Sequence, residues 1–299
     1  MLQAKIVVIG SINMDLVTRA AKFPRAGETL LGSSFQRFMG GKGANQAIAA
    51  ARLGANVAII GAVGDDDFGC EMTTNLRREG VLTDHVQTLA GEASGMANIT
   101  VADDENSIIV IAGANLGLSV NDIKDAEAQI ASADVILSQL EIPLDCVMAA
   151  AKLAAKYGKP FILNPAPACP LPRELLELVT ILTPNRYELA ASLGLPQDLP
   201  LDELIMRSPC PVLVTVGGQG AVYGDRHGIR RFAGFKVNAA DTTGASDAFN
   251  GALSVFWNKG IDTAVHRACA AAALSITQDG AQGGMPFADE LDRFLAERG

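Results

Sequence analysis

The stretch Asp241-Thr242-Thr243-Gly244-Ala245-Ser246-Asp247-Ala248-Phe249-Asn250-Gly251 has the composition of a small-residue turn that runs into a helix. Large apolar residues follow at 249, 253 and 256–257, a spacing that predicts a buried helix face over about 244–259. The residues at the start of that helix would offer backbone N–H groups, which bind anions together with the helix dipole. Asp247 is therefore either a helix cap or a general base beside a phosphate site.

Outward from this stretch, short apolar runs alternate with helical segments. The runs lie at 5–10, 56–62, 134–138, 160–164, 179–183 and 212–216, and they are apolar almost throughout, as expected for strands covered on both faces. The predicted helices lie at about 43–53, 68–79, 121–130, 144–157, 201–206, 244–259, 261–277 and 287–297. This alternation predicts an α/β fold with a mostly parallel central sheet and helices on both of its faces.

Two segments depart from this rhythm, because residues 11–39 and 86–113 show little helical pattern. Within the second segment, 96–102 and 107–112 alternate apolar and polar residues around a polar turn, which predicts a β-hairpin. We expect the two segments to form a small β-sheet lid or association surface outside the main sheet. The whole chain, 1–299, would then be a single domain.

Composition argues against several classes of function. The net charge is −9 and the basic residues are scattered, so a nucleic-acid surface is not expected. Five cysteines, an odd and dispersed number, favour reduced thiols in a cytoplasmic protein. No signal-like segment precedes the first apolar run, and no apolar run reaches about 18 residues, so a membrane span is not expected. Three dispersed histidines favour neither a metal cluster nor a Ser-His-Asp site.

The first candidate site residues are Asn13 and Asp15, just after the first apolar run. Ligands of open α/β sheets bind at the carboxyl ends of the strands. Spaced two residues apart on an extended segment, an amide and a carboxylate can hold adjacent hydroxyl groups. An Asx turn is the structural alternative.

The second candidate is Gly40-Gly41-Lys42-Gly43-Ala44-Asn45-Gln46-Ala47, which opens a predicted helix. Glycines around Lys42 would let the backbone approach a ligand closely, and Lys42 and Asn45 suit sugar hydroxyls. The motif is not a P-loop, since Lys42 is followed by glycine and not by Ser or Thr. It is not the dinucleotide fingerprint either, since Gln46 takes the place of the third glycine.

Three further candidates follow later strands. Glu141 comes after the run 134–138, where an acid can belong to a site or be merely solvated. Asn185 and Glu188 would share one face of a helix start, either as a magnesium site reached through water or as a helix cap. Thr215 precedes a glycine turn at 217–220 that could wrap a phosphate or simply link two strands.

The order of these motifs resembles the ribokinase-like (PfkB) carbohydrate kinase family over nearly the whole chain. The resemblance rests on the segments 10–15, 40–47, 140–141, 163–167, 183–188, 215–220 and 241–251. It implies a sheet sandwiched by helices, with a β lid that also forms a homodimer contact. It also implies an ATP-dependent sugar kinase that transfers the γ-phosphoryl group to a primary hydroxyl, with Mg²⁺ and K⁺ as cofactors.

The resemblance also implies roles for individual residues. The sugar site would comprise Asn13, Asp15, Gly41, Lys42, Asn45, Glu141 and Asp247, with Ile99 and Val110 as apolar lid contacts. Asp247 would be the catalytic base, and Gly244, Ala245 and Ser246 would surround the anion hole. The nucleotide would contact Asn185, Thr215, Gly217, Gly220 and Gly244, and Glu188 would hold Mg²⁺ through water. Asp241, with carbonyls near Thr243 and in the 276–284 loop around Gly280, would bind a monovalent cation.

Three features depart from the family pattern. Ser246 stands where members usually carry glycine, and it would be strained by about 1–2 kcal/mol if the position needed a positive φ. Gly284 stands where a serine often helps to bind the monovalent ion. The region 194–211 is also short for the family.

The resemblance points first to a pentose kinase that converts D-ribose to ribose 5-phosphate. Kinases acting on 2-deoxyribose, another sugar or a nucleoside stay open as alternatives. Ser246 leaves open a catalytically weakened sugar-binding or regulatory protein. A dinucleotide-dependent oxidoreductase on a doubly wound sheet is disfavoured, because the fingerprint is absent.

Overall fold

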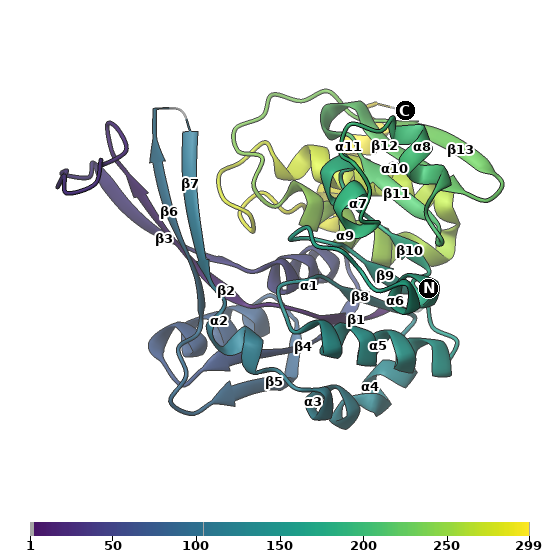
Figure 1. Cartoon of the computed structure of the whole chain (residues 1–299), viewed down its shortest axis with the longest axis horizontal. Coiled ribbons are helices and arrows are strands. Elements are labelled where there is room, and N and C mark those ends of the chain that lie inside the picture. The colour runs from purple at the N-terminus through teal and green to yellow at the C-terminus, as the bar shows by residue number, and fades with distance from the viewer. Residues whose placement is uncertain (1–2, 104, 299) are drawn as a thin grey trace.

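The computed structural model describes residues 3–103 and 105–298. Within them, nine strands form a large sheet in the order β13-β12-β11-β10-β9-β8-β1-β4-β5, and four strands form a small sheet in the order β3-β2-β6-β7 (Figure 1). The large sheet contains β1 (Lys5–Ile9), β4 (Asn56–Gly64), β5 (Leu82–Leu89), β8 (Val135–Ser138), β9 (Phe161–Leu163), β10 (Ile181–Leu182), β11 (Val212–Thr215), β12 (Gly220–Asp225) and β13 (Gly228–Ala233). The small sheet contains β2 (Asn13–Arg19), β3 (Ser34–Gly40), β6 (Gly95–Ala102) and β7 (Glu105–Ile111).

Helices cover both faces of the large sheet. They are α1 (Lys42–Arg52), α2 (Asp67–Arg78), α3 (Val120–Asp125), α4 (Glu127–Ser132), α5 (Leu144–Lys156), α6 (Arg173–Leu178), α7 (Arg186–Ser192), α8 (Leu201–Met206), α9 (Ala245–Phe256), α10 (Ile261–Ser275) and α11 (Ala288–Ala296). Side chains of β1 point alternately to two apolar clusters, so that Ile6 and Val8 pack on the side of α1 and α9. Val7 and Ile9 pack on the side of α5. A strand buried on both faces explains the unbroken apolar runs in the sequence.

The strand pairing confirms the predicted α/β class. From β5 through β11 the neighbouring strands run parallel, and β12 and β13 continue the sheet as antiparallel strands. The hairpin predicted near 96–112 is present as β6 and β7.

Some elements differ from the sequence prediction. Residues 86–89, which the sequence pattern places in the lid, belong to β5 at the edge of the large sheet. The hairpin of β12 and β13 was not predicted, because Gly220 and Gly224 interrupt its apolar pattern. The short segment 194–211 contains the single helix α8, in agreement with the prediction for 201–206.

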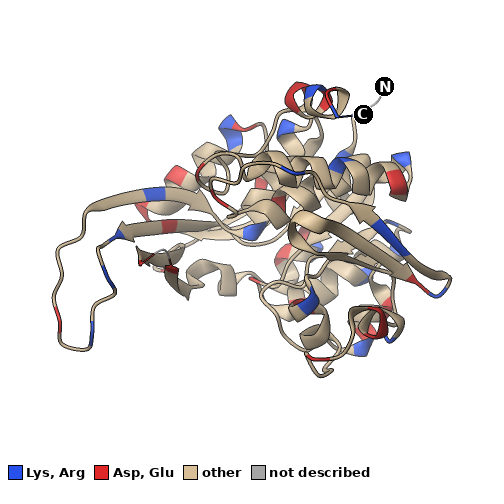
Figure 2. Ribbon diagram, turned by 90° about the horizontal axis from the view of Figure 1, so that it is seen from above, with Lys and Arg blue, Asp and Glu red and all other residues tan. Residues whose placement is uncertain are grey.

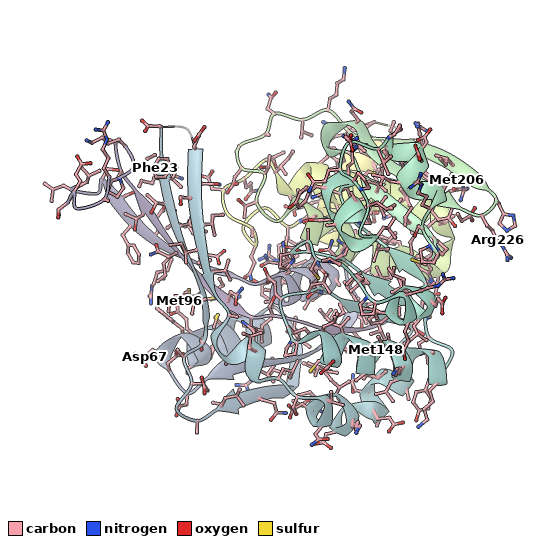
Figure 3. All side chains as sticks on the ribbon, in the orientation of Figure 1. Phe23, Asp67, Met96, Met148, Met206 and Arg226 are labelled. Atoms are coloured by element: carbon pink, nitrogen blue, oxygen red, sulfur yellow. The ribbon has the colours of Figure 1, made fainter. Side chains whose placement is uncertain are left out.

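The small sheet projects from the body of the molecule (Figure 1). Figure 3 shows Met96 near its base and Phe23 at its far end. The edge strand β7 carries a row of exposed apolar side chains, Ile108, Ile109, Val110 and Ile111.

Charged residues of both signs are interspersed over the surface (Figure 2). This distribution agrees with the absence of a basic stripe in the sequence. Among the described helices, none is both long and apolar enough to cross a membrane.

Candidate active site

The carboxyl ends of β1 and β8 meet the N-termini of α1 and α9. Asp247 lies in the first turn of α9, and its side chain is only 3% exposed. Its carboxylate accepts hydrogen bonds from Asn45 Nδ2 to Oδ2 and from Gln46 Nε2 to Oδ1, both at 2.9 Å. The side chain therefore bonds to α1 and does not cap its own helix, whose N-cap is Gly244.

The electrostatic environment of Asp247 contains opposing effects. Burial raises the pKa of its carboxyl group, while the charge of Lys42 and the amides of Asn45 and Gln46 oppose that rise. Burial alone would lower the pKa of Lys42, but the neighbouring carboxylates raise it on balance, Asp247 and Glu141 foremost. Lys42 is therefore charged, and it is the cation that faces this buried acid.

Asp15 and Glu141 complete an acidic group around Lys42. Burial, followed by the charges of Glu141 and Asp247, raises the pKa of Asp15 to about 7. Glu141 Oε2 accepts hydrogen bonds from Ser11 Oγ at 2.5 Å and from the backbone N–H of Lys42 at 3.1 Å. A carboxylate at the first residue of α1 also suits the positive end of the helix dipole.

The other predicted sugar residues lie around the same region. Gly41 is the N-cap of α1 with φ 85°, a left-handed conformation that favours glycine. Asn13 is buried, and its Oδ1 accepts a hydrogen bond of 2.7 Å from Asn115 Nδ2. In the sheet register Asp15 pairs with Ala97, and Ala97 pairs with Val110. Because paired residues share a face and residues two apart along a strand do too, Ile99 and Val110 lie on the face that carries Asp15.

The N-terminus of α9 differs from the sequence expectation in two respects. Ser246 is helical and is not among the described residues with positive φ, so the strain considered for this position does not arise. The required left-handed residue is Gly244, with φ 78°. The backbone N–H of Ala245, expected to be unpaired, donates to the Thr242 carbonyl at 3.3 Å. The N–H groups of Ser246 and Asp247 lie in the first turn, where no intrahelical acceptor exists.

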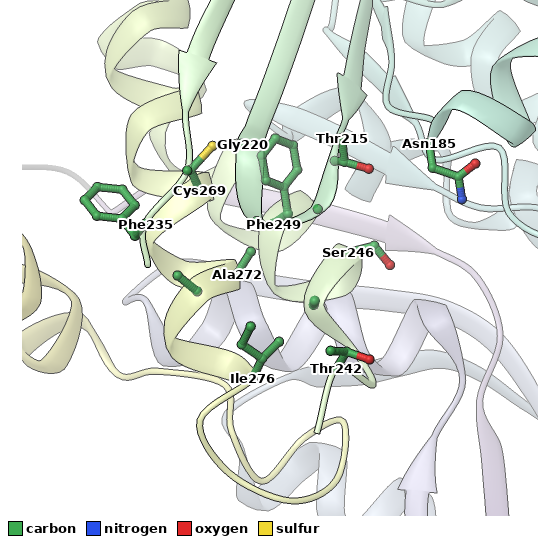
Figure 4. A pocket seen from close by; sticks show the side chains of 15 residues that line it. Asn185, Thr215, Gly220, Phe235, Thr242, Ser246, Phe249, Cys269, Ala272 and Ile276 are labelled. Atoms are coloured by element: carbon green, nitrogen blue, oxygen red, sulfur yellow. The ribbon is translucent and has the colours of Figure 1, made fainter. Parts of the chain in front are cut away.

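A cavity of about 390 Å³ adjoins this helix terminus. Its lining includes the predicted nucleotide residues Asn185, Thr215, Gly217 and Gly220 together with Ala245 and Ser246. Figure 4 shows polar side chains, Asn185, Thr215, Thr242 and Ser246, on one side and apolar ones, Phe249, Cys269, Ala272 and Ile276, on the other. Apolar side chains beside polar groups at a helix N-terminus suit a base and its attached phosphates.

Asn185 and Glu188 form a reciprocal capping box at the start of α7. Asn185 Oδ1 accepts the Glu188 N–H at 2.8 Å, and Glu188 Oε2 accepts the Asn185 N–H at 2.7 Å. The capping alternative considered from the sequence is therefore present. Burial raises the pKa of Glu188, although its backbone hydrogen bond and Lys42 oppose the rise.

Asp241 lies in the turn before α9. Its Oδ1 accepts hydrogen bonds from Thr243 N at 2.9 Å and Thr243 Oγ1 at 2.7 Å, and its Oδ2 accepts one from Gly280 N at 3.0 Å. Burial would raise the pKa of Asp241, but these hydrogen bonds and the charge of Arg19 together hold it below its usual range. The turn before α9 is thus tied to the 276–284 loop by an ionised carboxylate.

Close packing explains why a glycine stands at position 284 in this chain. A Cβ atom at this position would lie 1.9 Å from the Ser275 carbonyl oxygen. The present path of the loop therefore admits no serine there. Among the described residues, no group of three or more His, Cys, Asp or Glu side chains is placed to hold a metal ion.

Three site residues were missed in the sequence. Gln46 contacts Asp247 directly, whereas the sequence places it within the 40–47 motif without indicating a role for its side chain. Gln139 donates from Nε2 to Gln46 Oε1 at 2.7 Å, and Asn115 orients Asn13. For two of them, their position in the sequence could have indicated a role. Gln139 follows β8 directly, and Gln46 lies one turn into α1.

Comparisons with known proteins agree with this geometry. The model of the pfkB family carbohydrate kinases matches residues 3–288. Ribokinase from Bacillus subtilis is 44% identical over 97% of this chain and 99% of its own length. Deoxyribokinase from Salmonella typhi is 36% identical over 97% and 98%, respectively. The structure of Arabidopsis thaliana ribokinase complexed with ribose and ATP superimposes with a TM-score of 0.90 and 30% identity, covering 98% of this chain and 99% of that one. The chain belongs to the pfkB family of carbohydrate kinases.

Proposed function

We propose that this protein transfers the γ-phosphoryl group of ATP to the 5-hydroxyl of D-ribose and forms ribose 5-phosphate. One observation carries the proposal: the first turn of α9 borders two different environments through consecutive residues. Ser246 lines the cavity of about 390 Å³, while Asp247 points away into the acidic group around Lys42. A phosphoryl group held at this turn would lie between a nucleotide in the cavity and a sugar beside Asp247.

In this arrangement Asp247 accepts the proton of the attacking hydroxyl. Its contacts with Asn45 and Gln46 hold the carboxylate in place before the substrate arrives. Lys42 and the free N–H groups of the first turn of α9 stabilise the negative charge on the transferred group. Asn13, Asp15 and Glu141 bind the sugar hydroxyls, and Ile99 and Val110 cover the sugar from the lid face that carries Asp15.

The oxygen ligands at these positions fit the expected metal ions. Glu188 uses one lone pair of its carboxylate for the Asn185 N–H, which leaves capacity for the water shell of Mg²⁺. Bound Mg²⁺ would neutralise phosphate charge. Asp241 is ionised, and its backbone N–H donates to the Ile276 carbonyl of the 276–284 loop at 3.3 Å, so the carboxylate suits a monovalent cation such as K⁺.

Association and location form part of the proposal. The exposed edge strand β7 displays Ile108, Ile109, Val110 and Ile111, which are between 48% and 64% exposed. An unpaired apolar edge favours association, here as a homodimer through the lid. The five cysteines are all free, which fits a reducing, cytoplasmic compartment.

The proposal is tested by coupling ADP release to a panel of ribose, 2-deoxyribose, fructose and adenosine, with and without K⁺. We expect ribose to give the highest kcat/KM, and ³¹P NMR to place the product phosphate on the 5-oxygen. A higher kcat/KM for 2-deoxyribose than for ribose would make 2-deoxyribose the assigned substrate. Saturable ribose binding without ADP release from any sugar would replace the kinase with a sugar-binding protein.

A further inference from the structure

The two amides that hold Asp247 each have a donor end and an acceptor end. Asn45 and Gln46 both present the NH₂ end to the carboxylate. The reversed amide would place an oxygen beside a carboxylate oxygen, so that a hydrogen bond becomes a contact between two acceptors. The partner of each amide oxygen favours the observed orientation, and for Gln46 the Oδ1 of Asn164, which accepts a hydrogen bond of 3.2 Å from Gln46 Nε2, favours it too.

The oxygen of each of these two amides accepts a hydrogen bond from the side chain of another glutamine. Gln46 Oε1 accepts a hydrogen bond of 2.7 Å from Gln139 Nε2, and both side chains are fully buried. Asn45 Oδ1 accepts a hydrogen bond of 3.0 Å from Gln282 Nε2, which comes from the loop after α10. These donors keep the oxygen ends turned away from Asp247.

Gln282 is in turn held from two other elements. Its Oε1 accepts a hydrogen bond of 3.1 Å from Asn75 Nδ2 of α2. Its backbone carbonyl accepts one of 2.6 Å from Arg52 Nη1, whose guanidinium also pairs with Glu79. The donor end of Gln282 is therefore directed at Asn45 by contacts at both its side chain and its backbone.

We infer that Gln139 and Gln282 are positioning residues, which orient Gln46 and Asn45 so that both donate to the carboxylate of the base Asp247. The inference rests on the proposed function, because it assigns these glutamines to the same site. Gln282 contacts no reacting atom in this arrangement and acts through Asn45.

The two glutamines differ as sites for a test. Gln139 is fully buried, and its replacement threatens folding. Gln282 is half-buried, so Gln282→Met and Gln282→Glu can be compared in folded protein. Methionine removes the donor at similar length. Glutamate keeps the shape and the Asn75 contact, but it accepts only and so attracts the NH₂ end of Asn45 away from Asp247.

We expect Gln282→Met to lower kcat/KM for ribose by about threefold to tenfold, and Gln282→Glu by more than tenfold, since each weakens a hydrogen bond to a charged group. A role in loop packing alone predicts the reverse order, because glutamate is the closer isostere. Gln197→Met, at an exposed loop glutamine, is the matched control and should leave kcat/KM unchanged.

The acid limb of the pH profile gives a second readout. The charged groups that face Asp247 are Lys42 of α1, Asp15 of β2, Glu188 of α7 and Glu141 after β8. All four stay in place in Gln282→Met, so a move of the acid limb to higher pH by about half to one pH unit reports the weakened donor.

A double-mutant cycle decides whether Gln282 acts through Asn45. In an Asn45→Ala background, Gln282→Met should cost nothing further, because the amide that it orients is gone. Effects that multiply in the double variant would overturn the inference.

The proposed function can fail separately. If the wild-type protein phosphorylates no sugar, the kinase assignment is refuted. The inference is then tested by following the titration of Asp247 with ¹³C NMR of labelled aspartate carboxyl groups. The Asp247→Asn variant assigns the signal. Gln282→Met should then raise the pKa of Asp247. An unchanged titration would overturn the inference.

Discussion

Asp15 carries a destabilising charge in the free protein, and its removal should be stabilising. Its carboxyl group is buried beside Glu141 and Asp247, and although the charge of Lys42 opposes the rise, its pKa is raised from 3.8 to about 7. We expect Asp15→Asn to raise the free energy of unfolding at neutral pH while it weakens sugar binding. Stability traded for function in this way is common at binding sites.

The sign and size follow from linkage. A carboxyl group whose folded pKa lies above its unfolded value is fully tolerated below the unfolded pKa, and its cost grows as pH rises to the folded pKa. With the folded pKa at about 7, the difference of about three pH units, at about 1.4 kcal/mol each, makes the charge of Asp15 cost about 4 kcal/mol at pH 8. At about pH 5 the cost is about 1.5 kcal/mol. The pH-dependent part of the gain in Asp15→Asn is therefore about 2 to 3 kcal/mol.

Urea unfolding of wild-type protein and Asp15→Asn at about pH 5 and about pH 8 measures this difference, and packing changes cancel because they do not vary with pH. Asp241→Asn is the matched control. The pKa of Asp241 is lowered in the fold, so its stabilisation is present above the unfolded pKa and is lost only in stronger acid. That variant should lose a nearly constant amount between the two pH values. An equal gain for Asp15→Asn at both pH values would refute the account.

Three further predictions concern neighbouring features. Asp247→Asn should lower kcat by about 10²- to 10⁴-fold, as expected for loss of a general base, while calorimetry shows ribose binding within a few fold of wild type; a kcat within a few fold would contradict that role. Ser246→Gly should lower the free energy of unfolding by up to about 1 kcal/mol in urea titrations, because Ser246 is helical and unstrained; stabilisation would be the opposite result. Arg52→Met should destabilise by about 3 kcal/mol, since it leaves Glu79 and two loop carbonyls without their donor; thermal unfolding with an unchanged midpoint would count against it.

The main sheet could be predicted because its strands are buried on both faces. Nearly continuous apolar runs such as 56–62 and 134–138 stand out from the amphipathic helices around them, and both lie largely in parallel strands. The hairpin of β12 and β13 could not be predicted in the same way, because it combines glycines with exposed charges such as Arg230 and Arg231. Its pairing depends on β11, which is a tertiary contact.

The site, too, has a part that the sequence predicts and a part that it does not. Residues at the carboxyl ends of strands, such as Asn13 and Asp15, could be predicted as candidates because topology alone brings them to one edge. The contact of Gln46 with Asp247 could not, since the two residues are 201 positions apart and meet through the packing of α1 on α9. The same holds for Gln282, which reaches Asn45 across 237 positions. Local patterns identify which groups can do chemistry, whereas the long-range amide contacts that orient them emerge from packing.

The surplus of acids connects stability with ligand binding. Asp15, Glu141 and Asp247 face one cation, Lys42, so the free site holds more negative charge than it neutralises. In the proposed function a sugar would bring hydroxyl donors to this group, and a hydrogen bond to the ionised form of Asp15 or Asp247 would lower a pKa that burial raises. Sugar binding at this site would therefore recover the cost of holding the acids in the empty site. In the proposed mechanism this binding energy would keep Asp247 ionised for its role as proton acceptor, while Asn45 and Gln46 hold its carboxylate in place.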